Sequence, residues 1–199
     1  MNPDDISGLY YITHIANIES ICQKGILSHS LAKQLPHTSI AKSEVVALRK
    51  KKSVPQGRPL LEYVNLYFNP RNPMMYKVTD GGARMDDICL LKVGPNILMS
   101  AGVVITDGNA ASSYTRFYPS PAGLASLKRD EIFITSWNDE DPVRRFRLKS
   151  TTCSEVLVPD CIEPRFILEV ILPGTEMVKT VYGKTGAVEL TTDKTLFFG

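Results

Sequence analysis

The sequence predicts an α+β protein that folds as one domain. Short alternating or continuous apolar runs, typical of β-strands, recur along the chain, and only a few segments have helical spacing. A chain of 199 residues is long enough to bury one core, and 43% of its residues are hydrophobic. No Ser-, Gly- or Pro-rich linker and no internal repeat divides it. We therefore expect a single domain over residues 1–199.

The first elements are a strand, a cap and a short helix. Residues 9–15 alternate and are rich in Tyr and Ile, which predicts a strand. Asn17 is expected to cap the helix, with Glu19 in its first turn and Gly25 at its end. This order places His14 at a strand end beside the positive end of a helix, where anions and ribose hydroxyls bind readily.

The segment 63–76, which reads YVNLYFNPRNPMMY, has neither a helical nor a strand period. Pro70 and Pro73 fix φ and push the asparagine before each of them away from the helical region. The strand that ends near Phe68 should therefore leave the sheet in an ordered turn that carries Arg71. This turn is either a tightly packed corner or the wall of a pocket.

The remaining elements follow from the same signals. A helix is predicted in the polar segment between the first helix and the next strand, and a long irregular region, Asp107 to Lys149, should separate two groups of strands. The tail after the last strand is expected to be β-like. The helix is predicted over residues 43–51, and the strands over residues 60–68, 88–93, 102–105, 155–159 and 165–172.

Glu155 opens an apolar strand in which it shares one face with Leu157. An acidic residue in this position either faces a site or lies at a sheet edge. In the second interpretation it pairs with Arg147 or Lys149.

Charge and cysteine usage limit the function classes. The net charge is only +2, so the composition does not indicate a strongly basic nucleic-acid binder. Two basic clusters, at residues 42–58 and 144–149, are either solvated faces or phosphate contacts. The four cysteines are far apart and the three histidines are not spaced to complete a metal set, so we expect free buried thiols and no metal. No apolar run approaches the roughly 20 residues of a membrane span, and the N-terminus lacks signal-peptide features, which predicts a cytoplasmic protein without membrane contact.

Four segments in order resemble the DarT family of DNA ADP-ribosyltransferase toxins. They are ITHIANIESICQKGI, a basic stretch with Arg49, EYVNLYFNPRNPMMY and SEVLVP, and the resemblance covers residues 9–172. It implies an ADP-ribosyltransferase-like fold with a central split, mixed or antiparallel sheet. It also implies NAD as co-substrate, no metal, and transfer of ADP-ribose to guanine or thymine of single-stranded DNA. A toxin of this kind has a macrodomain antitoxin, DarG-like, as its partner.

The resemblance also assigns residues to the site. Glu155 would be the catalytic carboxylate, and Arg49 would contact the NAD phosphates or the target base. Where relatives usually have an acidic residue and an alanine, this chain has Ala16 and Ser154. The residues expected around NAD are His14, Ala16, Asn17, Gly25, Arg49, Tyr67, Phe68 and Met75.

The residue chemistry is consistent with these roles. Breaking the glycosidic bond of NAD builds positive charge on the ribose, as in sugar hydrolysis, and one ionised carboxylate stabilises such charge. A guanidinium is a poor proton acceptor at neutral pH, so Arg49 is expected to act by charge and orientation, although a part in removing the base proton stays open.

The region of about 107–155 is expected to present the DNA. Its aromatic rings suit stacking on unpaired bases, and its arginines suit phosphate contacts. The same rings would alternatively fill a small core under a long loop. The residues expected to contact DNA are Arg71, Tyr114, Arg116, Phe117, Tyr118, Arg144, Arg145 and Arg147, with Trp137 as a further stacking ring. Two other functions stay open: a non-catalytic module that binds single-stranded nucleic acid, and a transferase that modifies protein or RNA.

Overall fold

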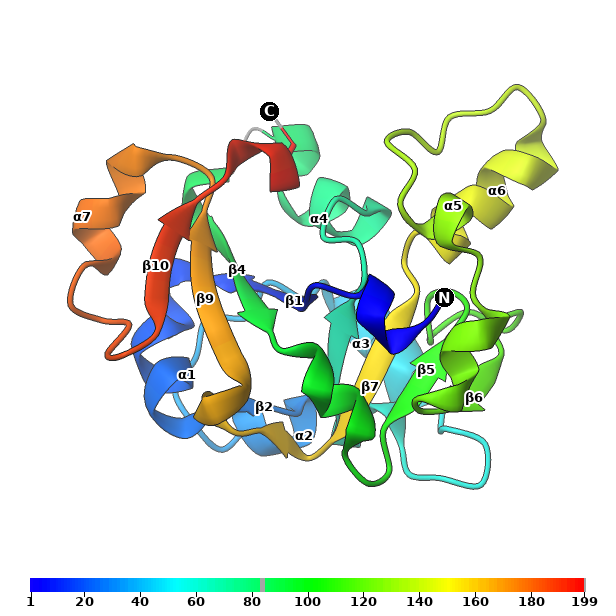
Figure 1. Ribbon diagram of the computed structural model, residues 1–199, viewed down its shortest axis with the longest axis horizontal. Helices are drawn as coiled ribbons and strands as arrows, with labels where there is room; N and C mark the ends of the chain where they lie inside the picture. The colour runs from blue at the N-terminus through cyan, green and yellow to red at the C-terminus, as the bar shows by residue number, and fades with distance from the viewer. Residues whose placement is uncertain (83–84, 199) are drawn as a thin grey trace.

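A computed structural model describes residues 1–82 and 85–198 and is built on one eight-stranded sheet with the order β10-β9-β4-β1-β3-β7-β5-β6 (Figure 1). The β9 and β10 strands pair in parallel and the other neighbours are antiparallel, so the sheet is mixed, as expected. The strands of this sheet are β1 Leu9–His14, β3 Tyr63–Tyr67, β4 Ile88–Val93, β5 Val104–Thr106, β6 Phe117–Pro119, β7 Glu155–Pro159, β9 Ile167–Leu172 and β10 Glu189–Thr192.

Short helices surround the sheet. The α5 and α6 helices lie with β5 and β6 at one end of the sheet, and α7 lies with β10 at the other (Figure 1). A separate pair is formed by β2 Ile26–Leu27 and β8 Cys161–Ile162. The helices are α1 Ile18–Lys24, α2 His29–Ala32, α3 Ser43–Lys50, α4 Pro73–Val78, α5 Arg129–Ile132, α6 Pro142–Thr151 and α7 Val178–Val181.

The sheet is split in its middle. The β1 and β4 strands pair at six positions and β3 and β7 at five, whereas β1 and β3 pair only at Tyr10 and Tyr67. The two halves of the sheet are therefore joined at one end of β1, and the sheet can open between β1 and β3 beyond that pair.

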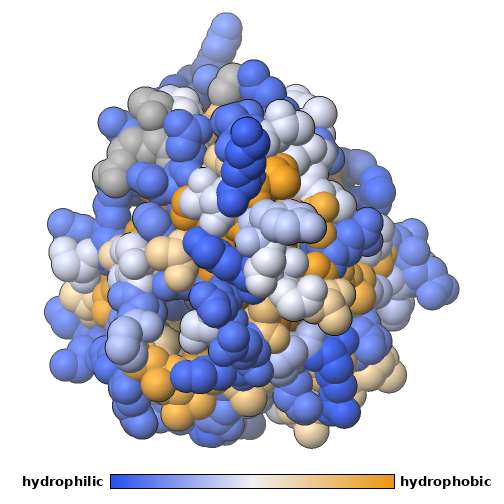
Figure 2. All heavy atoms as spheres, turned by 90° about the vertical axis from the view of Figure 1, so that its left-hand side faces the viewer, coloured by the Kyte–Doolittle hydropathy of each residue, from blue (hydrophilic) through white to orange (hydrophobic). Residues whose placement is uncertain are grey.

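Strand alternation divides the core between the two faces of the sheet. Leu9, Leu66 and Val156 lie in the larger core on one face. Tyr67 and Ile12 lie in a smaller core on the other face, together with residues from α4 and the C-terminal segment. The side of the molecule that carries β10 and α7 is mostly hydrophilic, with small scattered apolar groups (Figure 2).

Most of the predicted strands are confirmed. The strands predicted over 9–15, 88–93 and 155–159 match β1, β4 and β7 within a residue. Those predicted over 60–68 and 165–172 are shorter than expected, because 3₁₀ turns at Leu60–Glu62 and Pro164–Phe166 precede β3 and β9.

The prediction of a long irregular region over 107–149 was wrong. The region contains β6, a 3₁₀ turn at Ala122–Ser126, α5 and most of α6. The α6 helix has no buried residue, so its apolar period is weak, but Asp141 caps it and Pro142 occupies its first turn. The predicted turn after β3 likewise leads into α4, where the Asn72 carboxamide oxygen accepts hydrogen bonds from the backbone N–H groups of Met74 and Met75.

The four cysteines are free thiols, as expected, but only Cys89 and Cys153 are buried, and Cys161 is exposed. Within the described part of the chain, the helices lack the length and apolar character needed to cross a bilayer.

Candidate active site

Glu155 lies at the start of a central strand. Its strand, β7, pairs with β3 on one side and β5 on the other, so the edge position considered from the sequence is wrong. The Glu155 side chain is completely buried and is paired in register with Tyr67, which is paired with Tyr10. Directly paired residues share a face of the sheet, and His14 follows Tyr10 by an even number of residues on β1. His14 and Glu155 therefore project from the same face.

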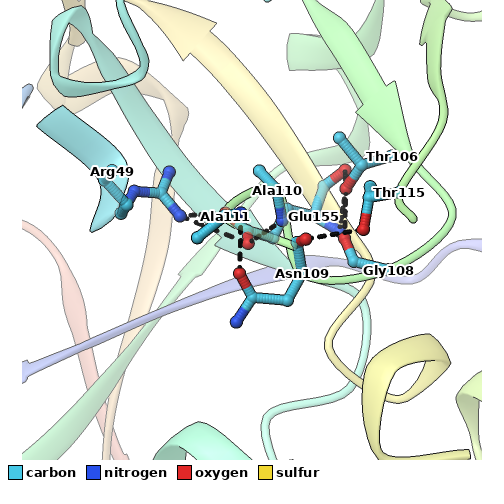
Figure 3. Close-up of polar contacts among 8 residues, drawn as sticks. All are labelled: Arg49, Thr106, Gly108, Asn109, Ala110, Ala111, Thr115 and Glu155. Atoms are coloured by element: carbon cyan, nitrogen blue, oxygen red, sulfur yellow. Dashed lines mark hydrogen bonds and ion pairs between the residues drawn. The ribbon is translucent and has the colours of Figure 1, made fainter. Parts of the chain in front are cut away.

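Arg49, in the last turn of α3, reaches across this face to Glu155 (Figure 3). Its Nη1 atom lies 2.9 Å from Oε2 and 3.3 Å from Oε1 of the carboxylate. The backbone N–H of Ala110 donates to Oε1 at 2.9 Å. Burial alone would lower the pKa of Arg49, but the negative charge of Glu155 and the hydrogen bond to it outweigh burial, so the pKa is raised. The pairing of Glu155 with Arg147 that the sequence allowed is wrong, because Arg147 contacts Glu131 instead.

The loop after β5 fixes the position of Glu155. The Thr106 hydroxyl accepts a hydrogen bond from the Glu155 backbone N–H at 3.0 Å and donates to the Gly108 carbonyl at 2.7 Å (Figure 3). The Thr115 hydroxyl donates to the Asn109 carbonyl at 2.6 Å. Sequence reasoning missed this loop, because its contacts to Glu155 use backbone groups and one hydroxyl, which carry no sequence signature.

A cleft of about 130 Å³ lies beside the Arg49–Glu155 pair, and its lining includes Thr13, Arg49, Tyr67 and Met74. Arg49 Nη2 is buried and has no hydrogen-bond partner among the described residues, so it offers donors to a ligand. Burial and then the charge of Glu155 raise the pKa of Tyr67 well above its usual value, which keeps its hydroxyl neutral. The cleft is smaller than the roughly 300–1,000 Å³ of typical ligand pockets, so a dinucleotide requires it to open.

Asn17 occupies the N-cap position of α1, as expected, but its side chain makes no capping hydrogen bond. A 3₁₀ turn, Ile15–Asn17, precedes the helix, and His14 Nδ1 accepts from the Ala16 backbone N–H at 3.0 Å. The Asn17 carboxamide instead donates to the Thr13 hydroxyl at 3.1 Å and to the Thr38 carbonyl at 2.8 Å, and accepts from the Thr38 backbone N–H at 2.9 Å. Asn17 thereby fastens the loop 37–41, whose residues line the cleft.

Four other residues predicted to bind NAD lie at separate places in the structure. They are His14, Gly25, Phe68 and Met75. His14 is partly exposed, with Nε2 4.0 Å from Asp87, and since its Nδ1 accepts a hydrogen bond, the neutral ring carries its proton on Nε2. Gly25 ends α1 at φ 88°, and a Cβ there would lie 2.2 Å from the Ile162 carbonyl oxygen, which accounts for glycine at this position. Phe68 is buried in the larger core, on the face opposite Glu155 and Tyr67, whereas Met75 packs in the smaller core with Tyr67.

The residues predicted to contact DNA do not form one continuous surface. Tyr114, Arg116, Tyr118 and Arg147 line a groove beside α6, and Phe117 packs in a small third core instead. Arg144 and Arg145 lie on exposed α6, where both contact Asp139.

Arg71 lies elsewhere, 5.0 Å from the centre of the Phe198 ring. Trp137 packs edge-to-face on Tyr76 and Phe198, with ring centres 6.0 and 5.7 Å apart. Trp137 therefore joins the C-terminal segment to α4 and does not lie with the groove residues. In the described ranges, the His, Cys, Asp and Glu side chains form no group that could hold a metal ion.

A mixed, split sheet with a buried carboxylate and an arginine facing its opening defines a domain of the ADP-ribosyltransferase-like fold class. A family model described as "ssDNA thymidine ADP-ribosyltransferase, DarT" matches residues 10–197. The chain belongs to the DarT family.

Named relatives agree with this assignment. A DNA ADP-ribosyl transferase–DNA ADP-ribosyl glycohydrolase fusion protein of Thermosipho africanus is 35% identical over 180 residues, which cover 87% of this chain and 44% of the fusion protein. The structure of Thermosipho africanus DarTG in complex with ADP-ribose superposes with a TM-score of 0.83 at 32% identity, covering 96% of this chain and 51% of that one. The chain thus spans about half the length of these relatives.

Structures of Thermus sp. 2.9 DarT match over nearly their whole length. The complex with ADP-ribosylated ssDNA has a TM-score of 0.83 at 25% identity and covers 98% of this chain and 97% of that one. The complex with carba-NAD+ has a TM-score of 0.78 at 25% identity and covers 98% and 99%.

Proposed function

We propose that this chain is an NAD-dependent DNA ADP-ribosyltransferase that attaches ADP-ribose to a nucleobase of single-stranded DNA. The observation that carries the proposal is the buried Glu155 carboxylate, held by Arg49 and the Ala110 N–H beside the opening of a split sheet. Family membership and the ADP-ribose, carba-NAD+ and ADP-ribosylated ssDNA bound to relatives support it.

In this proposal Glu155 acts on the ribose of NAD. The C1′–nitrogen bond breaks, its electron pair leaves with nicotinamide, and the Glu155 carboxylate stabilises the positive charge that develops on the sugar. A nitrogen of the base then forms the new bond to C1′ and gives up its proton to solvent water. Glu155 is already oriented by Ala110 and Thr106, so little reorganisation is needed at the moment of reaction.

Arg49 and His14 would hold the dinucleotide. The cleft beside the Arg49–Glu155 pair is too small for a dinucleotide, so it must open when NAD enters. Arg49 Nη2, which has no partner among the described residues, then suits the NAD diphosphate, and Nε2–H of His14 suits a ribose hydroxyl or the nicotinamide amide. Arg49 acts here by charge and orientation.

The test uses labelled NAD and short oligonucleotides. We expect label on single-stranded DNA, and we expect Glu155→Ala to abolish labelling while DNA affinity changes little. Binding of DNA without label would indicate the non-catalytic module, and label only on RNA or protein would indicate a different transferase. Loss of DNA affinity in Glu155→Ala, with labelling per bound molecule unchanged, would contradict the role of Glu155.

We propose thymine as the modified base, because the family description names thymidine. Guanine is the alternative acceptor. Mass spectrometry of a digested, modified oligonucleotide distinguishes them, since the added mass lies on one nucleoside only.

The biological role belongs to the same proposal. We infer a cytoplasmic toxin whose region 107–155 presents the DNA and whose partner is a macrodomain antitoxin that removes the modification. The glycohydrolase part named in the fusion relative supports this pairing. Expression of the chain should arrest growth, Glu155→Ala should not, and a glycohydrolase that acts on ADP-ribosylated DNA should rescue growth.

A further inference from the structure

We propose that a groove between α6 and the β5–β6 connection binds an unpaired nucleotide that flanks the modified one. The inference rests on the function proposed above. The groove has a volume of about 680 Å³ and lies at the end of the sheet that carries α5, α6 and β6 (Figure 1). We call it the aromatic groove and define it by Tyr114, Arg116, Lys128, Glu131, Phe146 and Arg147.

Two large aromatic rings stand exposed at this groove. Tyr114, in the β5–β6 connection, is 81% exposed, and Phe146, on α6, is 58% exposed. Their ring centres are 6.3 Å apart and the rings are nearly perpendicular. Exposed ring faces of this kind suit stacking with an unpaired base, whatever its identity. Sequence analysis selected Tyr114 but missed Phe146, because it did not predict α6.

The charges of the groove suit a phosphate. Three cationic side chains and two carboxylates line it. The Glu131 carboxylate is engaged by Arg147 and, at 3.2 Å, by Lys128. The second carboxylate, Asp107, accepts hydrogen bonds from the Arg116 backbone N–H at 2.8 Å and from the Tyr118 hydroxyl at 3.2 Å. The Arg116 guanidinium itself has no hydrogen bond or ion pair with any described residue, so it can reach a phosphate. The groove thus combines stacking surface with a spare cation.

The groove lies next to Glu155 but on the other face of the sheet. Tyr118, which lines the groove, is paired in register with Ile105, and Ile105 is paired with Val156. The Glu155 side chain projects from the opposite face, because Glu155 and Val156 are consecutive residues of one strand. Thr115 also lines the groove and holds the loop whose Ala110 N–H binds the carboxylate. A base in the groove therefore lies on the face of the sheet opposite the Glu155 carboxylate, so we take the occupant to be a flanking nucleotide of the same strand.

The experiment compares two DNA strands. One is a minimal acceptor, and the other extends the same acceptor on both sides. We expect Tyr114→Ala and Phe146→Ala each to raise the KM for the longer strand about tenfold, which corresponds to one lost stacking contact. The KM for the minimal acceptor and kcat at saturation should not change. Tyr114→Trp, which keeps a ring, should restore the affinity.

The matched control is Tyr182→Ala. Tyr182 is 80% exposed and directly follows α7, which lies at the opposite end of the sheet from α6 (Figure 1). This variant should leave both KM values unchanged. An equal rise in KM for the short and long strands in the groove variants would overturn the flanking position.

Binding measured without reaction separates this inference from the proposed function. Fluorescence anisotropy with the longer strand reports DNA binding without any transfer. If the wild type transfers no ADP-ribose, the proposed function fails. Weaker DNA binding by the groove variants would still support the groove as a nucleotide site. Unchanged DNA affinity in those variants overturns the inference. Loss of binding to a glycohydrolase partner, with DNA affinity unchanged, also overturns it, because the occupant is then a protein.

Discussion

Arg49 and Glu155 are both removed from water, so each charge is compensated by the other and not by solvent. The side chains are 12% and 0% exposed, and the closest atoms are 2.9 Å apart. A buried ion pair adds little stability compared with a pair of apolar side chains of similar volume. Removing one partner, however, leaves an uncompensated buried charge. The pair therefore constrains the fold as well as the chemistry.

Arg49→Met should lower the free energy of unfolding by about 3–5 kcal/mol, because the Glu155 charge loses its only ion-pair partner among the described residues. The double variant Arg49→Met/Glu155→Gln should regain most of this stability while staying inactive. Urea unfolding at neutral pH measures both. Arg58→Met, which breaks an exposed pair of the same 2.9 Å length to Asp160, is the control and should cost under about 1 kcal/mol. Similar losses in both single variants would show that burial of the Arg49 pair is unimportant.

Thr106 is a positioning residue for the same carboxylate. Thr106→Val keeps the side-chain shape but leaves the Glu155 backbone N–H without its acceptor, so we expect a loss of about 1–3 kcal/mol in stability. We also expect kcat to fall about tenfold or more at unchanged DNA affinity, since small displacements of a catalytic group are costly. Thr152→Val removes another buried threonine hydroxyl, bonded at 2.7 Å to Leu148 within α6, and should leave kcat unchanged. A normal kcat in Thr106→Val would remove Thr106 from the positioning network.

Elements with a strong buried pattern were predictable, and exposed ones were not. The continuous apolar runs of β4 and β7 match their predicted ranges because both faces of these strands are buried. The α6 helix buries none of its residues, and its signal is limited to Asp141 and Pro142 at its start. Asn17 matches the sequence rule for a helix N-cap, but a 3₁₀ turn precedes α1 and the Asn17 side chain donates to the Thr38 carbonyl of the loop 37–41 instead.

At the element scale, Asn17 links the start of α1 to the loop 37–41. Asn17→Ala removes three hydrogen bonds, two of them to the Thr38 backbone. The loop should then open more often, so we expect the KM for NAD to rise about tenfold with a smaller change in kcat, as for the loss of one or two net hydrogen bonds. Thr13→Val removes only one of these bonds and should have a smaller effect.

Hydrogen exchange of the NAD-free protein shows whether Asn17 acts by holding the loop 37–41 in place or by contacting NAD directly. In Asn17→Ala the amides of residues 37–41 should exchange faster before any NAD is added. If exchange stays at the wild-type rate while the KM for NAD rises, Asn17 contacts NAD directly and does not act through the loop.

The site as a whole depends on the order of strands in the sheet. Arg49 and Glu155 are 106 residues apart in sequence. The β3–β7 and β5–β7 pairings bring Glu155 within hydrogen-bond distance of Arg49 on α3 and of the Ala110 N–H. Candidate residues could be chosen from the sequence because their types and order match a family. Their contacts could not, since a register between distant strands has no local signal.

Burial across the whole molecule also sets the alkaline limit of stability. Burial raises the pKa of Cys153 from 9.0 to about 12, and it raises the pKa values of Cys89 and Tyr67 as well. The unfolded chain releases the two thiol protons above about pH 9 and the Tyr67 proton above about pH 10, while the folded protein keeps them. Stability is therefore complete below about pH 9 and falls as pH rises toward the folded-state values. Each group contributes a loss of about 1.4 kcal/mol per pH unit.

We therefore expect urea unfolding to give a lower free energy of unfolding at pH near 10 than at neutral pH. Cys153→Ala should reduce this difference by one group's share, and Cys161→Ala, at an exposed position, should not. An equal pH difference in wild type and Cys153→Ala would show that this thiol titrates in the folded protein as it does in the unfolded chain.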